Sequence, residues 1–257
     1  MKYRIIFFSL LLSSFLAAQK DSCHIRVQIE GFNGGKVKLI GVYADNNYFA
    51  DSAFVDEQGR FEFKRKSPLK PGYFYIILPD YSNFHMMVDH EQFFSMKAKK
   101  EDVIGTMEIK GSIDNVLLYE SLRLQVRHDK EIDSLNTLKK TLAANDPAQV
   151  KIEQAFNRIA SERKEQLEKF QKNHPNTLFS KFKVAGQNPE LVDVRLPDGQ
   201  PDRAKQLQYF RNAFWDNVDL ADLRMLHTPV MVNKLKRYIT ELTVQQPDSI
   251  IRVADMI

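Results

Sequence analysis

The sequence predicts an α+β protein in two domains: an N-terminal antiparallel β-sandwich or barrel over residues 22–111 and an all-α helical domain over residues 112–257. Two observations predict this division. Short segments that alternate apolar and polar residues fill the first part, and helical spacing of apolar residues replaces that alternation after Gly111. The 257 residues are 43% hydrophobic and 27% charged, a composition that excludes a disordered chain, a collagen and a polytopic membrane protein.

The first 18 residues have the order of a secretory signal peptide. Lys2 and Arg4 precede an uncharged run, Ile5–Ala18, that ends in small residues. The run is too short for a membrane span, which needs roughly 20 apolar residues. We therefore expect removal of residues 1–18, export to the periplasm or cell envelope, and no transmembrane segment afterwards. Loss of the two basic residues lowers the net charge of +4 by two, which argues against nucleic-acid partners.

Strand-like segments follow one another between residues 22 and 110. Residues 24–30 alternate apolar and polar, and Asn33-Gly34-Gly35 has the composition of a tight hairpin turn. Residues 73–78 are apolar on both faces, as in a central strand. The other expected strands cover residues 37–43, 48–55 and 60–64 and the alternating sets Phe84/Met86/Val88, Phe94/Met96/Ala98 and Met107/Ile109. About eight short strands at this spacing predict an antiparallel sandwich or barrel.

Helical periodicity fills the second part. One apolar stripe runs from Leu118 to Leu142 and another from Ile152 to Phe170, and together they predict a helical hairpin. Asp146 is placed to cap the second helix, and Pro147 fits its first turn. Helix breakers between residues 185 and 202 predict a long surface loop. Further helices are expected over residues 202–215, over residues 229–244 after the start signal Thr228-Pro229, and from Pro247 onward.

No catalytic motif is recognisable. The chain lacks the GxSxG elbow, the GxxxxGK[ST] phosphate loop and the GxGxxG fingerprint. Its single cysteine, Cys23, excludes an internal disulfide and a CxxC pair, and the residues before it are unsuited to lipid attachment. We expect Cys23 to be a free thiol at the start of a strand, where it could join two copies through an intermolecular bond. We therefore assign no catalytic, cofactor-binding or metal-binding residue and no cofactor.

The best metal candidate lies in one predicted strand. The imidazole and thioether groups of His85, Met86, Met87 and His90, with Met96 further on, suit a soft ion such as Cu(I). His85 and His90 are five positions apart, so they project to opposite faces of an extended strand, and Met86 points inward. Core methionines and exposed histidines are the favoured interpretation.

Three sets of charged residues are candidate functional sites, and for each of them a structural role is the favoured interpretation. Asp216, Asp219 and Asp222 are spaced like carboxylates on one helical face, suited to a hard cation or acid–base chemistry, but a helix cap at Asp219 with Asp222 in the first turn is favoured. The basic segment Lys234–Tyr238 is interpreted as a solvated helix face rather than a nucleic-acid site. Residues Glu162–Glu165 mix signs, as in an exposed face with i,i+4 pairs.

A family resemblance rests on residues in both domains. In the first domain they are Asp51, Ala53, Val55, Gly59–Phe63 and Gly72–Phe74, and in the second they are Asn115–Tyr119, His174–Thr177, Phe214–Asp216, Leu226–Pro229 and Tyr238–Ser249. With these residues the chain resembles the N-terminal region of envelope thioredoxin-like thiol–disulfide oxidoreductases, in which a β-rich module and a helical module, both of unknown function, precede the redox domain.

The resemblance implies a non-catalytic region that positions or dimerises a thioredoxin-like domain carrying the CxxC pair, and it implies protein partners or self-association. Ile250, Val253, Ala254 and Ile257 form an apolar stripe without helix-stop signals, so the chain is expected to continue past Ile257 unless the stripe packs onto the helix over residues 229–244. The alternative function is a stand-alone envelope binding or structural module. A metal-handling protein using His85 and Met87 is a third possibility.

Overall fold

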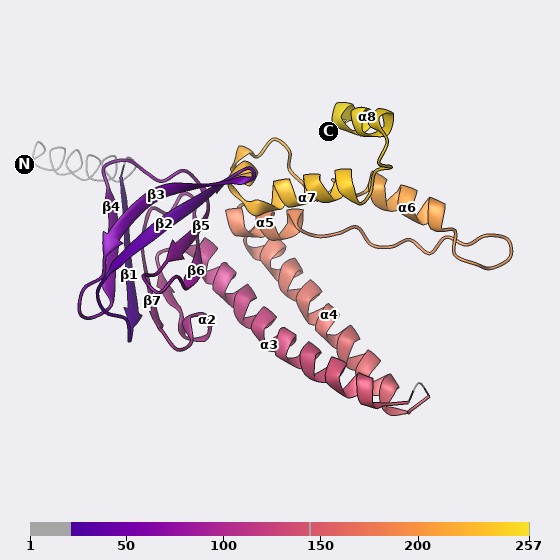
Figure 1. Ribbon diagram of the computed structural model, residues 1–257, viewed down its shortest axis with the longest axis horizontal. Coiled ribbons are helices and arrows are strands. Elements are labelled where there is room, and N and C mark those ends of the chain that lie inside the picture. Colours follow the sequence, from indigo (N-terminus) through magenta and orange to yellow (C-terminus); the bar gives the residue numbers. More distant parts are fainter. Residues whose placement is uncertain (1–21, 144, 257) are drawn as a thin grey trace, which may run out of the picture.

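The structure is a computed structural model that describes residues 22–143 and 145–256 (Figure 1). Within these ranges, eight strands over residues 23–110 precede a helical region, which confirms the predicted α+β fold class. The proposed signal peptide, residues 1–18, lies outside the described residues, so its removal stays a prediction.

The strands form two four-stranded sheets that pack face to face. They are β1 (Cys23–Glu30), β2 (Lys36–Tyr43), β3 (Asn46–Phe54), β4 (Arg60–Arg65), β5 (Gly72–Ile77), β6 (Asn83–Val88), β7 (Phe93–Lys99) and β8 (Glu108–Lys110). Sheet A has the order β4-β1-β7-β8 and sheet B the order β3-β2-β5-β6. The strand pairs are antiparallel except for β1 and β7, which run parallel in the middle of sheet A. The architecture is therefore a sandwich with one parallel pair.

The alternation in the sequence places the sandwich core. In β1, Ile25, Val27 and Ile29 are buried, and the residues between them are partly or fully exposed. Phe84 and Met86 of β6 are buried from the opposite sheet. Strand β5 lies between β2 and β6 and is apolar on both faces, which confirms it as a central strand.

The predicted hairpin at Asn33-Gly34-Gly35 is wrong in its pairing. Gly34 and Gly35 have φ angles of +69° and +89°, as a tight turn requires. The strands on either side belong to different sheets, however, so this turn carries the chain from sheet A to sheet B. The hairpin forms instead between β2 and β3. Turn composition predicts a reversal of the chain but does not identify the strand that pairs next.

The helical region contains a long hairpin and a set of shorter helices. Its elements are α3 (Ile113–Thr141), α4 (Ala148–Asn173), α5 (Leu178–Ala185), α6 (Arg203–Asn212), the 3₁₀ helix η1 (Leu223–His227), α7 (Pro229–Thr240) and α8 (Pro247–Met256), and a short α2 (Val103–Thr106) precedes β8. Figure 1 shows α3 and α4 running side by side away from the sandwich, as the two apolar stripes predict. The prediction that Asp146 caps α4 is wrong by one residue, because Pro147 is the N-cap, although the Asp146 carboxylate accepts the Ala148 N–H at 2.8 Å.

Several helix limits differ from the sequence predictions. Helices α6 and α7 end at Asn212 and Thr240, before the expected limits of 215 and 244. The short elements α2, α5 and η1 are not predicted, because four to eight residues give too little periodicity to detect. In α8, Val253 is buried while Ala254 is exposed, so the predicted apolar stripe is only partly buried. Ile257 lies outside the described residues.

Helices cover one face of the sandwich. Helix α3 packs against β6, and η1 packs against β2 and β5, so the outer face of sheet B lies against the helical region. Leu118 and Tyr119 of α3 and Phe179 of α5 belong to the same hydrophobic core as the strands. A smaller core of Phe214, Tyr238 and Val253 holds α7 and α8 together. Of the helices in the described ranges, none has the length and apolarity that a membrane crossing requires.

Candidate functional site

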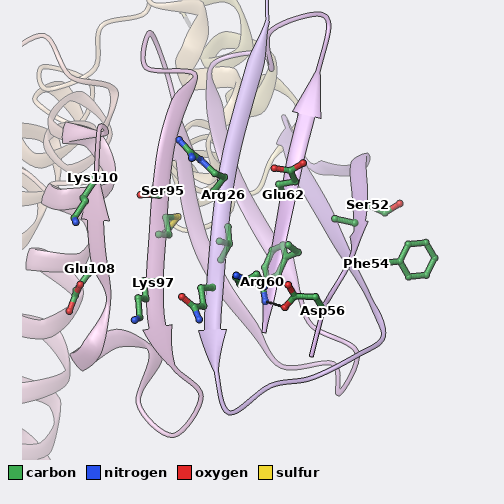
Figure 2. A pocket seen from close by; sticks show the side chains of 15 residues that line it. Arg26, Ser52, Phe54, Asp56, Arg60, Glu62, Ser95, Lys97, Glu108 and Lys110 are labelled. Carbon is green, nitrogen blue, oxygen red and sulfur yellow. Dashed lines mark hydrogen bonds and ion pairs between the residues drawn. The ribbon is translucent and has the colours of Figure 1, made fainter. Parts of the chain in front are cut away.

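The outer face of sheet A is the candidate site, because its polar side chains remain in solvent while sheet B is covered. We call this surface the open face and define it by Arg26 and Gln28 of β1, Arg60 and Glu62 of β4, Ser95 and Lys97 of β7, and Glu108 and Lys110 of β8. These residues line a hollow of about 670 Å³. Figure 2 shows their side chains on neighbouring strands, with Phe54 of β3 pointing outward at one edge. The strand period of two places them together.

Ion pairs fix part of the open face. His24 Nε2 lies 2.7 Å from Glu62 Oε2, and this hydrogen bond lowers the pKa of Glu62. Lys97 Nζ lies 2.6 Å from Glu30 Oε1, an interaction that lowers the pKa of the glutamate and raises that of the lysine. These shifts keep the groups charged at neutral pH. Glu62, Glu30 and Lys97 therefore present fixed charges on the open face.

Three residues of the open face have no ion-pair partner among the described residues. They are Arg26, Glu108 and Lys110, all of them exposed. An exposed sheet face of mixed charge with a basic surplus is suited to contact another charged macromolecular surface, since charge complementarity gives orientation and association rate.

Cys23 opens β1, as predicted, but it does not reach the surface. Its side chain is 1% exposed, and burial raises the pKa of its thiol to about 11. Thiolate, the reactive form, is therefore scarce at neutral pH. The expectation that Cys23 could link two copies by a disulfide is wrong for the folded chain, because a second thiol cannot approach it.

The metal candidates are separated by the fold. His85 lies on the outer face of sheet B under the helices, where its Nδ1 is 2.5 Å from the Tyr73 hydroxyl, and burial lowers its pKa. The interpretation of His85 as exposed is therefore wrong. Met86 and Met87 are both fully buried, on opposite faces of β6, and His90 lies exposed beyond the strand end. Across residues 22–143 and 145–256, no three His, Cys, Asp or Glu side chains gather as metal ligands would.

The start of α3 is bound to β6 by side-chain hydrogen bonds. Asn115 Oδ1 accepts the Met87 N–H at 2.8 Å, and its Nδ2 donates to the Met87 carbonyl at 2.7 Å. The Tyr119 hydroxyl donates to the His85 carbonyl at 3.0 Å. Strand β6 is an edge of sheet B, and Asn115 satisfies backbone groups that have no strand partner on that side. We call this contact the junction.

Buried carboxylates surround the junction. Asp114 is 3% exposed and accepts the Phe179 N–H at 2.7 Å, and burial raises its pKa to about 6. Asp89 receives Arg224 Nη1 at 2.6 Å on one oxygen, while its other oxygen is buried without a hydrogen bond from the described residues. Burial also raises the pKa of Asp89. Sequence analysis missed this set, because Asp89 and Arg224 are far apart in the chain and no local pattern joins them.

The aspartate trio has a structural role that differs in detail from the prediction. Residues 213–222 lie in turns and irregular segments, so Asp216, Asp219 and Asp222 do not share a helical face. Asp222 is itself the N-cap of η1 and accepts the Arg224 N–H, so the assignment of the cap to Asp219 is wrong. Lys181 binds Asp219 at 3.1 Å and Asp222 at 2.9 Å. Arg224 also lowers the pKa of Asp222 by hydrogen bonding to it.

The two other charged segments are corrected as well. Lys234 and Tyr238 of α7 are buried, so the basic segment is only in part a solvated face. Glu162 does make an i,i+4 pair with Arg158, but it also binds Arg127 and His128 of α3, and these hydrogen bonds lower its pKa to about 2. The charges of this segment therefore join α3 to α4 in addition to supporting α4 itself.

A comparison with protein families finds one match, which covers part of the chain. Residues 23–118 match the family described as Domain of unknown function (DUF4369). The match spans the strands and the first residues of α3, and so includes Asn115 of the junction. No curated protein and no solved structure matches the chain significantly.

Proposed function

We propose that this chain is a non-catalytic binding module of the periplasm or cell envelope that positions a thioredoxin-like thiol–disulfide oxidoreductase domain. The redox chemistry then belongs to a CxxC pair outside residues 1–257, because this sequence has a single cysteine. The observation that carries the proposal is the burial of that cysteine. A thiol that is 1% exposed, with a pKa raised to about 11, can neither attack a disulfide nor be resolved by a second thiol.

The family match supports the redox context. Domains of this family commonly precede thioredoxin-like proteins, and residues 23–118 match it. The open face supplies the proposed contact surface, since it is exposed, hollowed and fixed by ion pairs at His24–Glu62 and Lys97–Glu30. A partner surface that carries carboxylates would complement Arg26 and Lys110, which form no ion pair with the residues that the structure describes.

A stand-alone binding module is the second candidate. The open face favours it equally, because nothing in its chemistry requires that the partner be a redox domain. The two functions differ in one measurable respect, namely whether a thioredoxin-like domain binds here.

The test uses purified chain and the envelope thioredoxin-like domains encoded by the same genome. We expect the chain alone to show no turnover in insulin reduction, and one such domain to bind it in titration calorimetry. The double variant Arg26→Glu/Lys110→Glu should weaken that binding about tenfold or more. The matched control Lys139→Glu/Lys140→Glu, at the exposed far end of α3, should bind as the native chain does. Binding of none of these domains would favour the stand-alone module, and turnover by the chain alone would refute both.

A further inference from the structure

A second cavity lies within the helical region, away from the open face. Its volume is about 340 Å³, it opens to solvent, and it is lined by α5, the segment after α5, the turn around Phe214 and α7. The lining residues are Phe182, Lys183, Gly186, Gln187, Asn188, Phe214, Pro229, Val230, Asn233, Lys234 and Arg237. They include three cationic side chains and no carboxylate. We call it the basic cavity.

Lys234 is the most buried of the three cations. It is 6% exposed, its Nζ donates to the Gln187 carbonyl at 3.1 Å, and the ammonium lies 4.2 Å from the ring centroid of Phe214. An ammonium group has three N–H donors. One is used by the carbonyl and one is satisfied by the aromatic face, so a third donor has no acceptor among the described residues.

Lys183 lacks a counter-charge too. Its side chain has no ion pair within the described ranges, and burial together with the nearby Arg163 lowers its pKa. For Lys234 the causes of a lowered pKa are burial and Arg237. Charged groups around both lysines are therefore positive. Arg237 is the exception within the cavity, since it pairs with Glu241 at 3.1 Å on the outer side of α7.

Buried charges in proteins are normally paired, because removing an unpaired ion from water is costly. Two buried carboxylates elsewhere in the chain follow this rule: Asp89 has Arg224, and Asp222 has Lys181 and Arg224. Buried Asp114 has no ion pair within the described residues, and burial raises its pKa instead. The basic cavity departs from the rule, because buried Lys234 and half-buried Lys183 line it and no acid does. An anion that enters from solvent would supply the missing charge and accept the free donors.

We propose that the basic cavity binds a small organic carboxylate, with the anion held by Lys183 and Lys234 and an apolar body packed against the partly exposed Phe182 and Pro229. The amide side chains of Asn188 and Asn233 at the rim can orient the carboxylate oxygens. A volume of about 340 Å³ lies at the lower end of ligand pockets, so the ligand is small. This inference goes beyond the proposed function and shares no residue with the open face.

The structure provides its own probe. Trp215, the single tryptophan of the chain, has its ring 6.0 Å from Lys234 Nζ, so its fluorescence reports on this region. We would titrate the purified chain with benzoate, with the uncharged isostere benzamide and with sulfate, following tryptophan fluorescence and calorimetry. Benzoate should bind with one-to-one stoichiometry. Benzamide and sulfate should each bind with an affinity at least about tenfold lower, because benzamide lacks the charge and sulfate lacks the apolar body.

Variants separate the lysines from general charge effects. Lys183→Met and Lys234→Met should each weaken benzoate binding about tenfold or more, the loss expected for a charge-assisted hydrogen bond. The control Lys236→Met removes an exposed lysine of the same helix and should bind as the native chain does. If Lys234→Met does not fold by circular dichroism, Lys183→Met decides.

Three outcomes overturn the inference. They are no benzoate binding up to about 10 mM, equal affinity for benzamide or sulfate, and full affinity in the Lys183→Met variant. Because the Arg26→Glu/Lys110→Glu pair tests the open face alone, failure here leaves the proposed function intact, and the reverse also holds.

Discussion

Asp114 provides a sharp test of the electrostatics at the junction. Its pKa rises from 3.8 in the unfolded chain to about 6, chiefly because burial penalises the charged form, with smaller contributions from Asp89 and Glu91. The group is protonated in the native state and ionised in the unfolded state between these pH values. Stability from this group is therefore complete below about pH 4 and lost as pH rises to about 6. About two pKa units correspond to about 3 kcal/mol.

The perturbation is Asp114→Asn. The amide oxygen can still accept the Phe179 N–H, while the buried charge is removed. At pH values above 6 we expect the variant to be more stable than the native chain by about 1–3 kcal/mol, and near pH 4 the two should be equal. Equilibrium urea unfolding at both pH values measures this difference. Asp133→Asn, at an exposed position of the same helix, is the matched control and should change little at either pH.

One result would refute the reasoning about Asp114. If the Asn variant is less stable than the native chain at neutral pH, the ionised carboxylate stabilises the fold, which would mean that the Phe179 N–H and Arg224 together outweigh burial. Carboxylates with a lowered pKa change the stability in a different pH range. Glu162, with its pKa near 2, loses its contribution only as pH falls below its ordinary value of 4.5.

Three other outcomes follow from the structure. Asn115→Ala should lower the free energy of unfolding by about 2–4 kcal/mol, because it strands a buried N–H and C=O of Met87, whereas Asn136→Ala on the exposed side of α3 should have little effect in the same urea assay. Cys23 should react with a thiol reagent only when denaturant unfolds the chain, and rapid labelling of the native chain would contradict its burial. Limited proteolysis should cut first within the exposed loop over residues 187–202, and a first cut inside β1 would contradict the packing.

The sequence predicts the position of a helix or strand well when the signal lies within that element. The alternation in β1 and the start signal at Thr228-Pro229 are local, and both give elements close to the predicted positions. Patterns fail where the partner is remote. No local signal at Asn33-Gly34-Gly35 shows that β1 pairs with β4 and β7 rather than with β2.

The same limit applies to the candidate sites. The polar positions of the open face follow from strand alternation, but their assembly into one hollow depends on strand order, which the sequence does not show. The basic cavity is even harder to predict from the sequence. Lys234 looks like an exposed lysine because its neighbours in sequence are charged, and it is buried only because Phe214 and Gln187 close over it from other segments.

The end of the β-region lies at a different residue when it is judged from the sequence periodicity than when it is judged from the contacts at the junction. Alternation ends near Gly111, and the prediction of two separable folding units meeting there stays a prediction. Asn115 nevertheless lies four residues beyond that point and satisfies both backbone groups of Met87 in β6. A fragment that ended at Gly111 would leave these groups and the outer face of sheet B open to water. The family match extends to residue 118 and so retains Asn115. The physical unit of the β-region therefore includes the first turn of α3, although the sequence pattern of that turn is purely helical.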